Sequence, residues 1–293
     1  MIAQPCTDFK RFLALREMAP GAVALSLMPD AALAMARRYG CGGADWRQKL
    51  QALLKPVGAE VFFDDSLMEA RRRTEAGELL RRLSEPEAMP LVLCGCPCWQ
   101  KKLTEEGLGL GALYTRPALE HRSRTLAIRS LVAGSRGLPF SRVAHVTVVC
   151  CAAQKESYCL SQGEAPGEAE EYVFTLRETA LWLFQGGVAP FSGGEESPAV
   201  SAPGEEESQG RLGGVLSLTV EKLTGVRVAP QAFALEATDG HLAVRQGFFP
   251  LPGRTLRYAQ VQGLHEMPWL RDQLRGRSLR CDLLEVFSCA CCH

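Results

Sequence analysis

Short apolar runs alternate with longer amphipathic stretches along most of this chain. The runs are too short for helices, and they predict buried strands at residues 22–27, 61–63, 91–94, 146–149, 172–174 and 283–287. The stretches between them have helical spacing, at residues 30–38, 45–54, 65–83, 117–133, 175–184, 215–223 and 264–274. Strands that alternate with helices are typical of right-handed crossovers and parallel sheets. We therefore expect an α/β fold with mainly parallel sheets flanked by helices.

The length of 293 residues is enough for two lobes. We expect an N-terminal extension over 1–20, a first α/β lobe over 21–165 and a second α/β lobe over 166–293. Residues 192–210 are rich in Glu, Ser, Gly and Pro, which predicts a flexible acidic loop in the second lobe. Antiparallel strands are also expected in that lobe, at residues 226–228 and 233–249.

Composition excludes several classes of partner. Basic and acidic residues balance at 33 each, so nothing favours nucleic acid. The arginines at 71–73 and 81–82 lie in a Glu-rich helical stretch, which we interpret as a solvated helix face. No apolar run approaches the roughly 18 residues of a membrane span, and the chain does not start with the basic region of a signal peptide. We expect an intracellular protein with no membrane or nucleic-acid partner.

Twelve cysteines are the first sign of chemistry, because disulfides are rare in reducing compartments. Three groups of them lie at the ends of predicted strands, at residues 94–98, 150–151 and 289–292. The carboxyl ends of parallel strands line one edge of a sheet, so thiols far apart in sequence can meet there. Thiolates suit iron–sulfur clusters or zinc, and we therefore expect a metal site. We interpret the cysteines that stand alone as small buried apolar residues, namely Cys6, Cys41, Cys159 and Cys281.

The three groups also carry motifs that resemble a known family. Cys96-Pro97-Cys98-Trp99 resembles the first signature of the iron-only hydrogenases and their eukaryotic relatives. The segment 145–151, with the sequence HVTVVCC, is similar to the second signature, and the segment 285–289, EVFSC, is similar to the third. The likeness extends over about residues 20–293. It indicates a divergent member of the eukaryotic branch, which contains the cytosolic iron–sulfur assembly factor (nuclear prelamin A recognition factor-like protein) and the prelamin A recognition factor.

The resemblance implies two α/β lobes with one [4Fe-4S] cluster in the cleft between them. By position, Cys96, Cys151 and Cys289 match three of its ligands. The fourth ligand would be His293, four residues after Cys289, with Cys292 as the alternative. We interpret His145 as a residue that leads into its strand rather than as a ligand.

Other positions depart from the hydrogenase pattern. Gly95 stands where hydrogenases have a proton-relaying cysteine, Cys150 replaces a proline, and Gln154 replaces a lysine. These differences imply that the chain has no diiron subsite and no hydrogenase activity. Only Cys6 and Cys41 are available for the N-terminal cluster of the assembly-factor branch, so we expect that second cluster to be missing, like the branch's C-terminal tail.

The resemblance thus implies a non-catalytic scaffold or adaptor in the maturation of cytosolic and nuclear iron–sulfur proteins. Its expected partners are cytosolic iron–sulfur assembly and targeting proteins, and its expected location is the cytoplasm, with the nucleus as a second compartment. Three alternatives stay open: a reduced [FeFe]-hydrogenase-type oxidoreductase, a Cys₃His zinc site formed by the same residues, and a degenerate fold that binds nothing.

Overall fold

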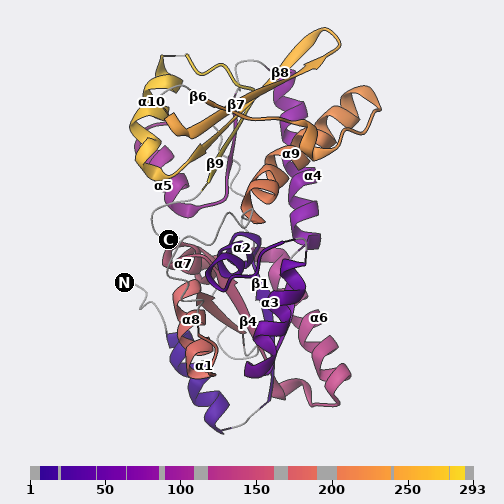
Figure 1. Ribbon diagram of the computed structural model, residues 1–293, viewed down its shortest axis with the longest axis vertical. Coiled ribbons are helices and arrows are strands. Elements are labelled where there is room, and N and C mark those ends of the chain that lie inside the picture. Colours follow the sequence, from indigo (N-terminus) through magenta and orange to yellow (C-terminus); the bar gives the residue numbers. More distant parts are fainter. Residues whose placement is uncertain are drawn as a thin grey trace. The chain divides into compact units, whose positions relative to one another are not determined.

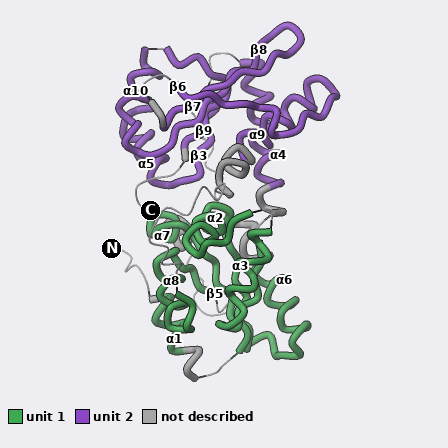
Figure 2. Tube along the Cα trace, viewed as in Figure 1, with its two compact units in different colours: residues 1–65, 116–204 green, residues 66–115, 205–293 purple. Residues whose placement is uncertain are grey.

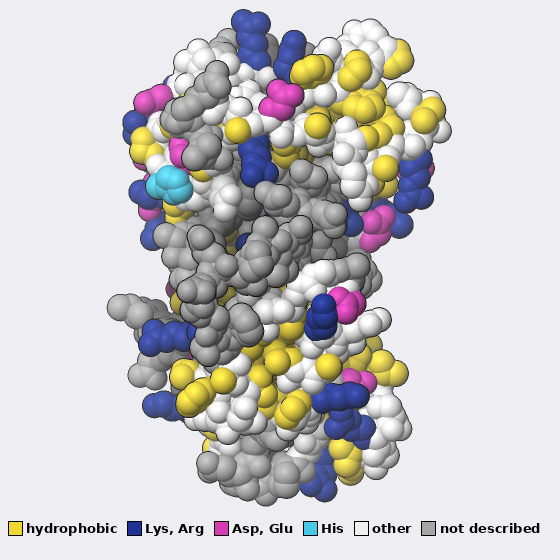
Figure 3. Space-filling view, in the orientation of Figure 1, with side chains coloured by type: hydrophobic (Ala, Val, Ile, Leu, Met, Phe, Trp, Pro, Cys, Tyr) yellow, Lys and Arg dark blue, Asp and Glu magenta, His cyan; other side chains and the backbone are white. Residues whose placement is uncertain are grey.

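The computed structural model (Figure 1) forms two compact units, shown in Figure 2. Unit 1 comprises Met1–Asp65 and Arg116–Gly204, and unit 2 comprises Ser66–Thr115 and Glu205–His293. The structure describes residues 7–18, 21–43, 45–63, 65–85, 90–108, 118–161, 171–189, 203–238, 241–276 and 278–287. Figure 3 shows side chains of both units by chemical type on one face.

The two units do not follow the expected division between residues 165 and 166, because each is built from two separate chain segments. Strand β5 (Glu171–Thr175), expected to open the second lobe, pairs with β4 (Val143–Val149) in unit 1. The expected N-terminal extension contains helix α1 (Thr7–Met18), which also belongs to unit 1. Its Phe12 is fully buried, with edge-to-face ring contacts to Phe174 and Trp182.

The sheet of unit 1 has four strands in the order β2-β1-β4-β5, and all three pairings are parallel. Every residue of the central strands β1 (Ala22–Leu27) and β4 is buried, which explains why they read as continuous apolar runs. The parallel α/β arrangement expected from the sequence is confirmed here. The remaining strand and the helices of this unit are β2 (Ala59–Phe63), α2 (Pro29–Arg38), α3 (Trp46–Leu54), α6 (Ala118–Arg136), α7 (Ala152–Ser161) and α8 (Leu176–Gln185), with the short 3₁₀ turns η1 (Lys55–Val57) and η3 (Phe140–Arg142).

The sheet of unit 2 is mixed. Its order is β3-β9-β8-β7-β6, in which β3 (Leu91–Cys94), β9 (Leu283–Phe287) and β8 (Arg254–Gln262) are parallel neighbours. Strands β7 (His241–Leu251) and β6 (Glu236–Thr238) then pair antiparallel. The expected strands do not include β8, although its apolar residues are separated by Arg and Gln as in a strand with one polar face. Gly253, at φ +76°, makes the turn from β7 into β8.

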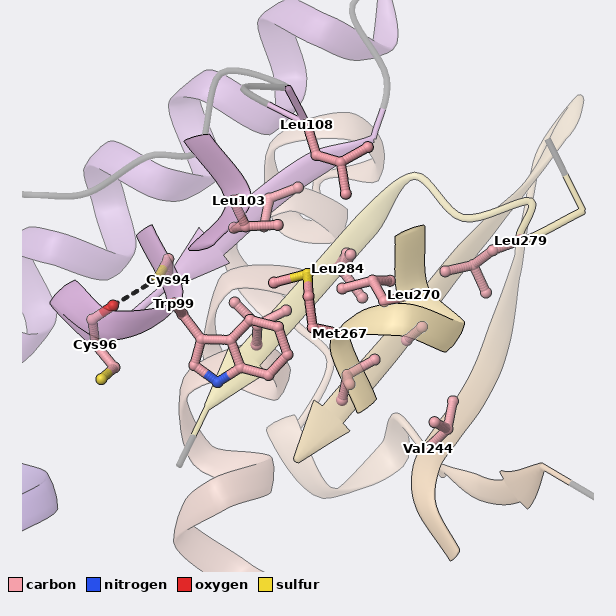
Figure 4. Packing of buried hydrophobic residues seen from close by; sticks show 14 residues of the cluster. Cys94, Cys96, Trp99, Leu103, Leu108, Val244, Met267, Leu270, Leu279 and Leu284 are labelled. Atoms are coloured by element: carbon pink, nitrogen blue, oxygen red, sulfur yellow. Dashed lines mark hydrogen bonds between the residues drawn. The ribbon is translucent and has the colours of Figure 1, made fainter. Parts of the chain in front are cut away.

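Helices cover both faces of the unit 2 sheet, and β3 shows how the strand pattern allows this. Leu91 and Leu93 pack with residues of α4 (Asp65–Leu83) and α9 (Pro203–Thr224). The alternate residues Val92 and Cys94 pack instead with α5 (Pro97–Glu105) and α10 (Met267–Arg275), as the buried cluster in Figure 4 shows. Two 3₁₀ turns, η4 (Pro230–Ala232) and η5 (Leu264–Glu266), complete the unit.

Helix α9 corrects the expected loop over 192–210. The helix begins at Pro203 and continues through Gly213 and Gly214, although the sequence pattern predicts a start only after these glycines. A proline followed by Glu205–Glu207 suits the first turn of a helix, since acidic residues stabilise its positive end. A Cβ at Gly213 would lie 2.7 Å from the carbonyl oxygen of Pro230, so this glycine lets the helix pack closely. Residues 190–202 lie outside the described residues.

Four further expectations from the sequence concern helices and strands taken one at a time. The capping box of α8 is confirmed, because the Thr175 hydroxyl accepts from the Glu178 N–H while the Glu178 carboxylate accepts from the Thr175 N–H. Residues 226–228 form no strand. Helix α6 runs past Gly134 to Arg136, since a glycine with ordinary helical torsions does not by itself end a helix. No helix in the described ranges is long and apolar enough to cross a membrane.

Candidate metal centre

Cys151 lies at the junction of a strand and a helix in unit 1. Strand β4 ends at Val149 and α7 begins at Ala152, so Cys150 and Cys151 form the turn between them. The Cys151 carbonyl accepts the Lys155 N–H at 3.0 Å, which is the first hydrogen bond of the helix. The Cys151 side chain is buried, with 4% of its surface exposed. A thiolate here would lie at the N-terminus of the helix, where the helix dipole favours negative charge.

The topology of the sheet marks the same place. The chain passes from β1 to β2 on one side, whereas β4 and β5 lie on the other side of β1. Open α/β sheets bind ligands where the strand order reverses in this way, at the carboxyl ends of the strands. The ends of β1 and β4 are joined by a hydrogen bond from the Met28 N–H to the Val148 carbonyl (3.2 Å). Cys151 follows β4 by two residues, so it lies at this switch point.

Cys96 occupies the corresponding place in unit 2. It follows β3 and is the N-cap of α5, with extended backbone torsions (φ −122°, ψ 125°) and Pro97 at the first helical position. Its carbonyl accepts the Gln100 N–H at 3.2 Å and also the Cys94 thiol at 3.1 Å. In Figure 4 Cys96 lies at the margin of the apolar cluster, with its sulfur directed away from Leu103 and Met267. Two predicted ligands are therefore held in the same strand–cysteine–helix arrangement.

Strand β9 ends at the same edge of the unit 2 sheet as β3, the strand that precedes Cys96. Leu91 of β3 pairs with Leu283 of β9, and Cys94 pairs with Val286. The two strands therefore reach their carboxyl ends together. Cys289, Cys292 and His293 follow Phe287 in sequence and lie outside the described residues.

The expectation that all three cysteine groups lie at one sheet edge needs correction. Strands β3 and β9 are neighbours in the sheet of unit 2, whereas β4 belongs to the sheet of unit 1. The pattern of apolar runs predicts that strands exist, but it carries no information on which sheet each one joins. In the described part of the chain, no group of three or more His, Cys, Asp or Glu residues is placed to hold a metal ion.

Two of the other cysteines, Cys41 and Cys94, are buried, and Cys281 is partly buried. Burial raises the pKa of Cys281 to about 12, and the adjacent Asp282 acts in the same direction. Burial also raises the pKa of Cys41 and of Cys94. A thiol that stays neutral resembles a small apolar side chain, which agrees with our interpretation of Cys41 and Cys281. Cys6 and the side chain of Cys159 lie outside the described residues.

Gln154 and Lys155 of α7 both bind groups of the protein itself. The Gln154 Oε1 accepts the Cys150 N–H at 2.7 Å and so fixes the turn before the helix. The Lys155 Nζ donates to both carboxylate oxygens of Glu178, at 2.9 and 3.0 Å, and its side chain is 6% exposed. Because Glu178 also closes the capping box of α8, one carboxylate joins α7 to α8. The sequence alone gives no sign of this pairing.

A network of buried polar residues in unit 2 is also absent from the sequence-based expectations. Glu75 of α4 is fully buried; its Oε1 lies 2.6 Å from Arg211 Nη2 and 2.9 Å from Arg71 Nε. Burial acts to raise the pKa of Glu75, but the Arg211 and Arg71 guanidiniums outweigh it and lower that pKa. The interpretation of 71–73 and 81–82 as a solvated face holds for Arg73 and Arg81, which are 69% and 52% exposed. It is wrong for Arg71 and Arg82, at 19% and 8%, because each turns inward to a carboxylate.

His145 is likewise part of the buried structure of unit 1. It is the third residue of β4 rather than a residue that leads into it, and only 1% of its surface is exposed. Its Nε2 is hydrogen-bonded to the Ser26 Oγ at 2.8 Å, and its Nδ1 lies 3.2 Å from the Thr125 Oγ1. Thr125 also donates to Glu171 at 2.9 Å. These contacts with Ser26 of β1 and Thr125 of α6 give His145 a structural role.

Comparison with known proteins identifies the family. The family described as iron only hydrogenase large subunit, C-terminal domain, matches residues 22–292. The chain belongs to this family.

The family resemblance extends to a curated relative from Danio rerio, the "Cytosolic Fe-S cluster assembly factor narfl". It is 28% identical to this chain over 142 residues. The matched region covers 44% of this chain and 33% of that protein, so the likeness spans about a third of the relative's length.

Solved structures of [FeFe]-hydrogenases share the fold. Apo [FeFe]-hydrogenase HydA1 from Chlamydomonas reinhardtii has a TM-score of 0.60 at 18% identity, and the likeness covers 97% of this chain and 82% of that one. A second [FeFe]-hydrogenase, studied for oxygen inactivation of its H cluster, has a TM-score of 0.65 at 16% identity, over 97% of this chain and 83% of that one. At these identities the likeness establishes the fold alone.

Proposed function

We propose that this chain binds one [4Fe-4S] cluster through Cys96, Cys151 and Cys289, with His293 or Cys292 as the fourth ligand. The observation that carries the proposal is the shared arrangement of Cys96 and Cys151. Each thiol is 4% exposed, follows a buried parallel strand and lies at the start of a helix. Cysteine binds such a cluster as its thiolate, and helix N-termini stabilise thiolates.

The register of β3 and β9 supports Cys289 as the third ligand. Cys94 lies opposite Val286, and Cys289 follows β9 by two residues, as Cys96 follows β3 by two. The strands that precede Cys96 and Cys289 in sequence therefore end beside each other. The donor set of soft sulfur ligands beside apolar side chains such as Trp99 and Leu103 fits an iron–sulfur cluster.

We further propose that the protein does not catalyse hydrogen chemistry and has no diiron subsite. Gly95 offers no acid–base group at the position before Cys96. Gln154 binds the backbone of its own turn, and Lys155 is paired with Glu178. These contacts hold the side chains that follow Cys151 within unit 1.

The biological role that we propose is supported by the relative. The name of the zebrafish protein is that of a cytosolic iron–sulfur assembly factor, and this supports a role as scaffold or adaptor in the maturation of cytosolic and nuclear iron–sulfur proteins. Its partners would then be assembly and targeting proteins of that system. The cytoplasm, with the nucleus as a second compartment, is the location that this role requires.

Anaerobic reconstitution with iron and sulfide tests the cluster. Wild-type protein should hold about four iron and four sulfide per chain, with the broad visible absorption of a cubane cluster. C96S and C151S should lose most of this iron. C281S and C41S are the matched controls in units 2 and 1, and both should keep it. Zinc without sulfide in the purified protein would instead support the Cys₃His alternative.

A further inference from the structure

Five polar side chains meet in unit 2 beside the carboxyl ends of β3 and β9. We call this group the buried clamp; its members are Arg71, Glu75, Arg211, Gln260 and Glu285. They come from α4, α9, β8 and β9. Glu75 is fully buried, and Gln260 and Glu285 are 3% and 4% exposed. Figure 1 shows α4 and α9 side by side, as their shared apolar cluster requires.

The clamp makes a continuous connection from one strand end to the other. The Arg71 Nη2 donates to the carbonyl oxygen of Cys94, the last residue of β3, at 3.2 Å. Arg71 then pairs with Glu75, and Glu75 pairs with Arg211. The Arg211 Nη1 lies 3.8 Å from the Glu285 Oε1, whose other oxygen accepts from Gln260 at 2.8 Å. Glu285 lies within β9, two residues before its end.

This position is unexpected if the clamp serves stability alone. Strands β3 and β9 are already joined by parallel pairing and covered by apolar clusters on both faces. Apolar residues of similar volume often stabilise a fold as well as a buried ion network does, because charges lose hydration on burial. What an ion network offers beyond stability is fixed geometry, since guanidinium–carboxylate contacts are directional.

We propose that the buried clamp positions two ligand segments of the metal centre. It holds the carboxyl ends of β3 and β9 at a set distance, so that Cys96 and the segment with Cys289 leave the sheet in the geometry that a cluster needs. Arg71 and Arg211 are therefore positioning residues that act through the Cys94 carbonyl and through Glu285. The inference rests on the proposed cluster, and it extends that proposal from the ligands to their support.

The test compares R71M and R211M with R81M. Arg81 lies on the same helix as Arg71, but it is 52% exposed and pairs with Glu78 and Glu85 outside the clamp. The first measurement is amide hydrogen exchange of the apoprotein. R71M should speed exchange at 91–94 and R211M at 283–287, while 22–27 in unit 1 keeps its wild-type rate. R81M should leave all three segments unchanged.

The second measurement is iron affinity and the electron paramagnetic resonance signal of the reduced, reconstituted protein. Loss of the residues that support a metal ligand typically weakens metal binding about 10–100-fold. We expect R71M and R211M to lower the iron affinity within that range and to change the g values of the resonance signal. R211K keeps the charge and should recover part of the affinity. The double variant E75Q/R211M removes both charges of the Glu75–Arg211 pair instead of one, so it should fold even where R211M does not, and it should still bind iron weakly.

The outcomes separate the two proposals. If the wild-type chain takes up no iron, the cluster proposal fails. Hydrogen exchange of the apoprotein still shows whether Arg71 and Arg211 hold the ends of β3 and β9. If the wild type binds iron and R71M, R211M and E75Q/R211M match it in exchange, affinity and signal, the clamp has no positioning role.

Discussion

Cys94 of β3 lies opposite Val286 of β9 in a parallel pair, so both strands end at the same edge of the unit 2 sheet. This register joins the two strands that precede cysteine groups far apart in sequence. It also places the buried clamp where it can act on both of them.

The Lys155–Glu178 pair should contribute strongly to the stability of unit 1. Its side chains are 6% and 12% exposed, and K155M would leave the Glu178 carboxylate buried without its cation. We expect a loss of about 3 kcal/mol in the free energy of unfolding. K49M is the matched control, since Lys49 and Asp45 are 48% and 55% exposed, and it should cost under about 0.5 kcal/mol. Urea unfolding measures both; equal losses would show that burial of the pair is unimportant.

Acid should destabilise unit 2 partly through Glu78. Hydrogen bonds from Arg81 and Arg82 lower the pKa of Glu78 from 4.5 to about 2. A pKa lowered by folding adds stability above the unfolded value, and this stability is lost as pH falls through the folded value. The loss should therefore develop between pH 4.5 and about 2. Urea unfolding at several pH values should give a shallower acid dependence for E78Q than for wild type, whereas E236Q, at an exposed position of β6, should follow wild type.

The hydrogen bond between Ser26 and His145 should also be measurable. S26A removes a buried hydroxyl that lies 2.8 Å from the imidazole Nε2, and we expect a cost of about 1–3 kcal/mol. S84A removes an exposed hydroxyl at the end of α4, so it should change the free energy of unfolding by less than about 0.5 kcal/mol. Calorimetric unfolding measures the stability of both variants. A neutral S26A would mean that His145 needs no partner on β1.

Two helical glycines should respond in opposite ways to alanine. G213A places a Cβ 2.7 Å from the Pro230 carbonyl oxygen and should destabilise unit 2. A Cβ at Gly77 in α4 would meet nothing within 4 Å, so G77A should stabilise the helix by about 0.5–1 kcal/mol. Thermal unfolding of the two variants checks the sign of each change. The close packing of α9 on residue 230 would be contradicted if G213A were as stable as G77A.

The sequence predicts the elements of this fold better than their assembly. Strands such as β1 and β4 are buried on both faces and therefore stand out as apolar runs. In β8, Arg and Gln separate the apolar residues, so this strand contains no such run. The pairing of β5 with β4 could not be predicted, because periodicity does not tell which strands are neighbours.

The same distinction applies to the candidate site. The motifs located Cys96 and Cys151 at strand ends, and the structure confirms those positions. The buried clamp could not be predicted from the sequence, because a run of arginines among glutamates has the composition of a solvated helix face. Only tertiary contacts show that Arg71 turns inward while Arg73 does not.

The central claim is that Cys96, Cys151 and Cys289 bind a [4Fe-4S] cluster. The most direct measurement is the iron and sulfide content per chain after anaerobic reconstitution of the wild type, C151S and C41S. Our account predicts about four iron and four sulfide in the wild type and in C41S, and a large loss in C151S. A wild-type protein that stays colourless and free of iron, or a C151S variant as fully loaded as C41S, would contradict it.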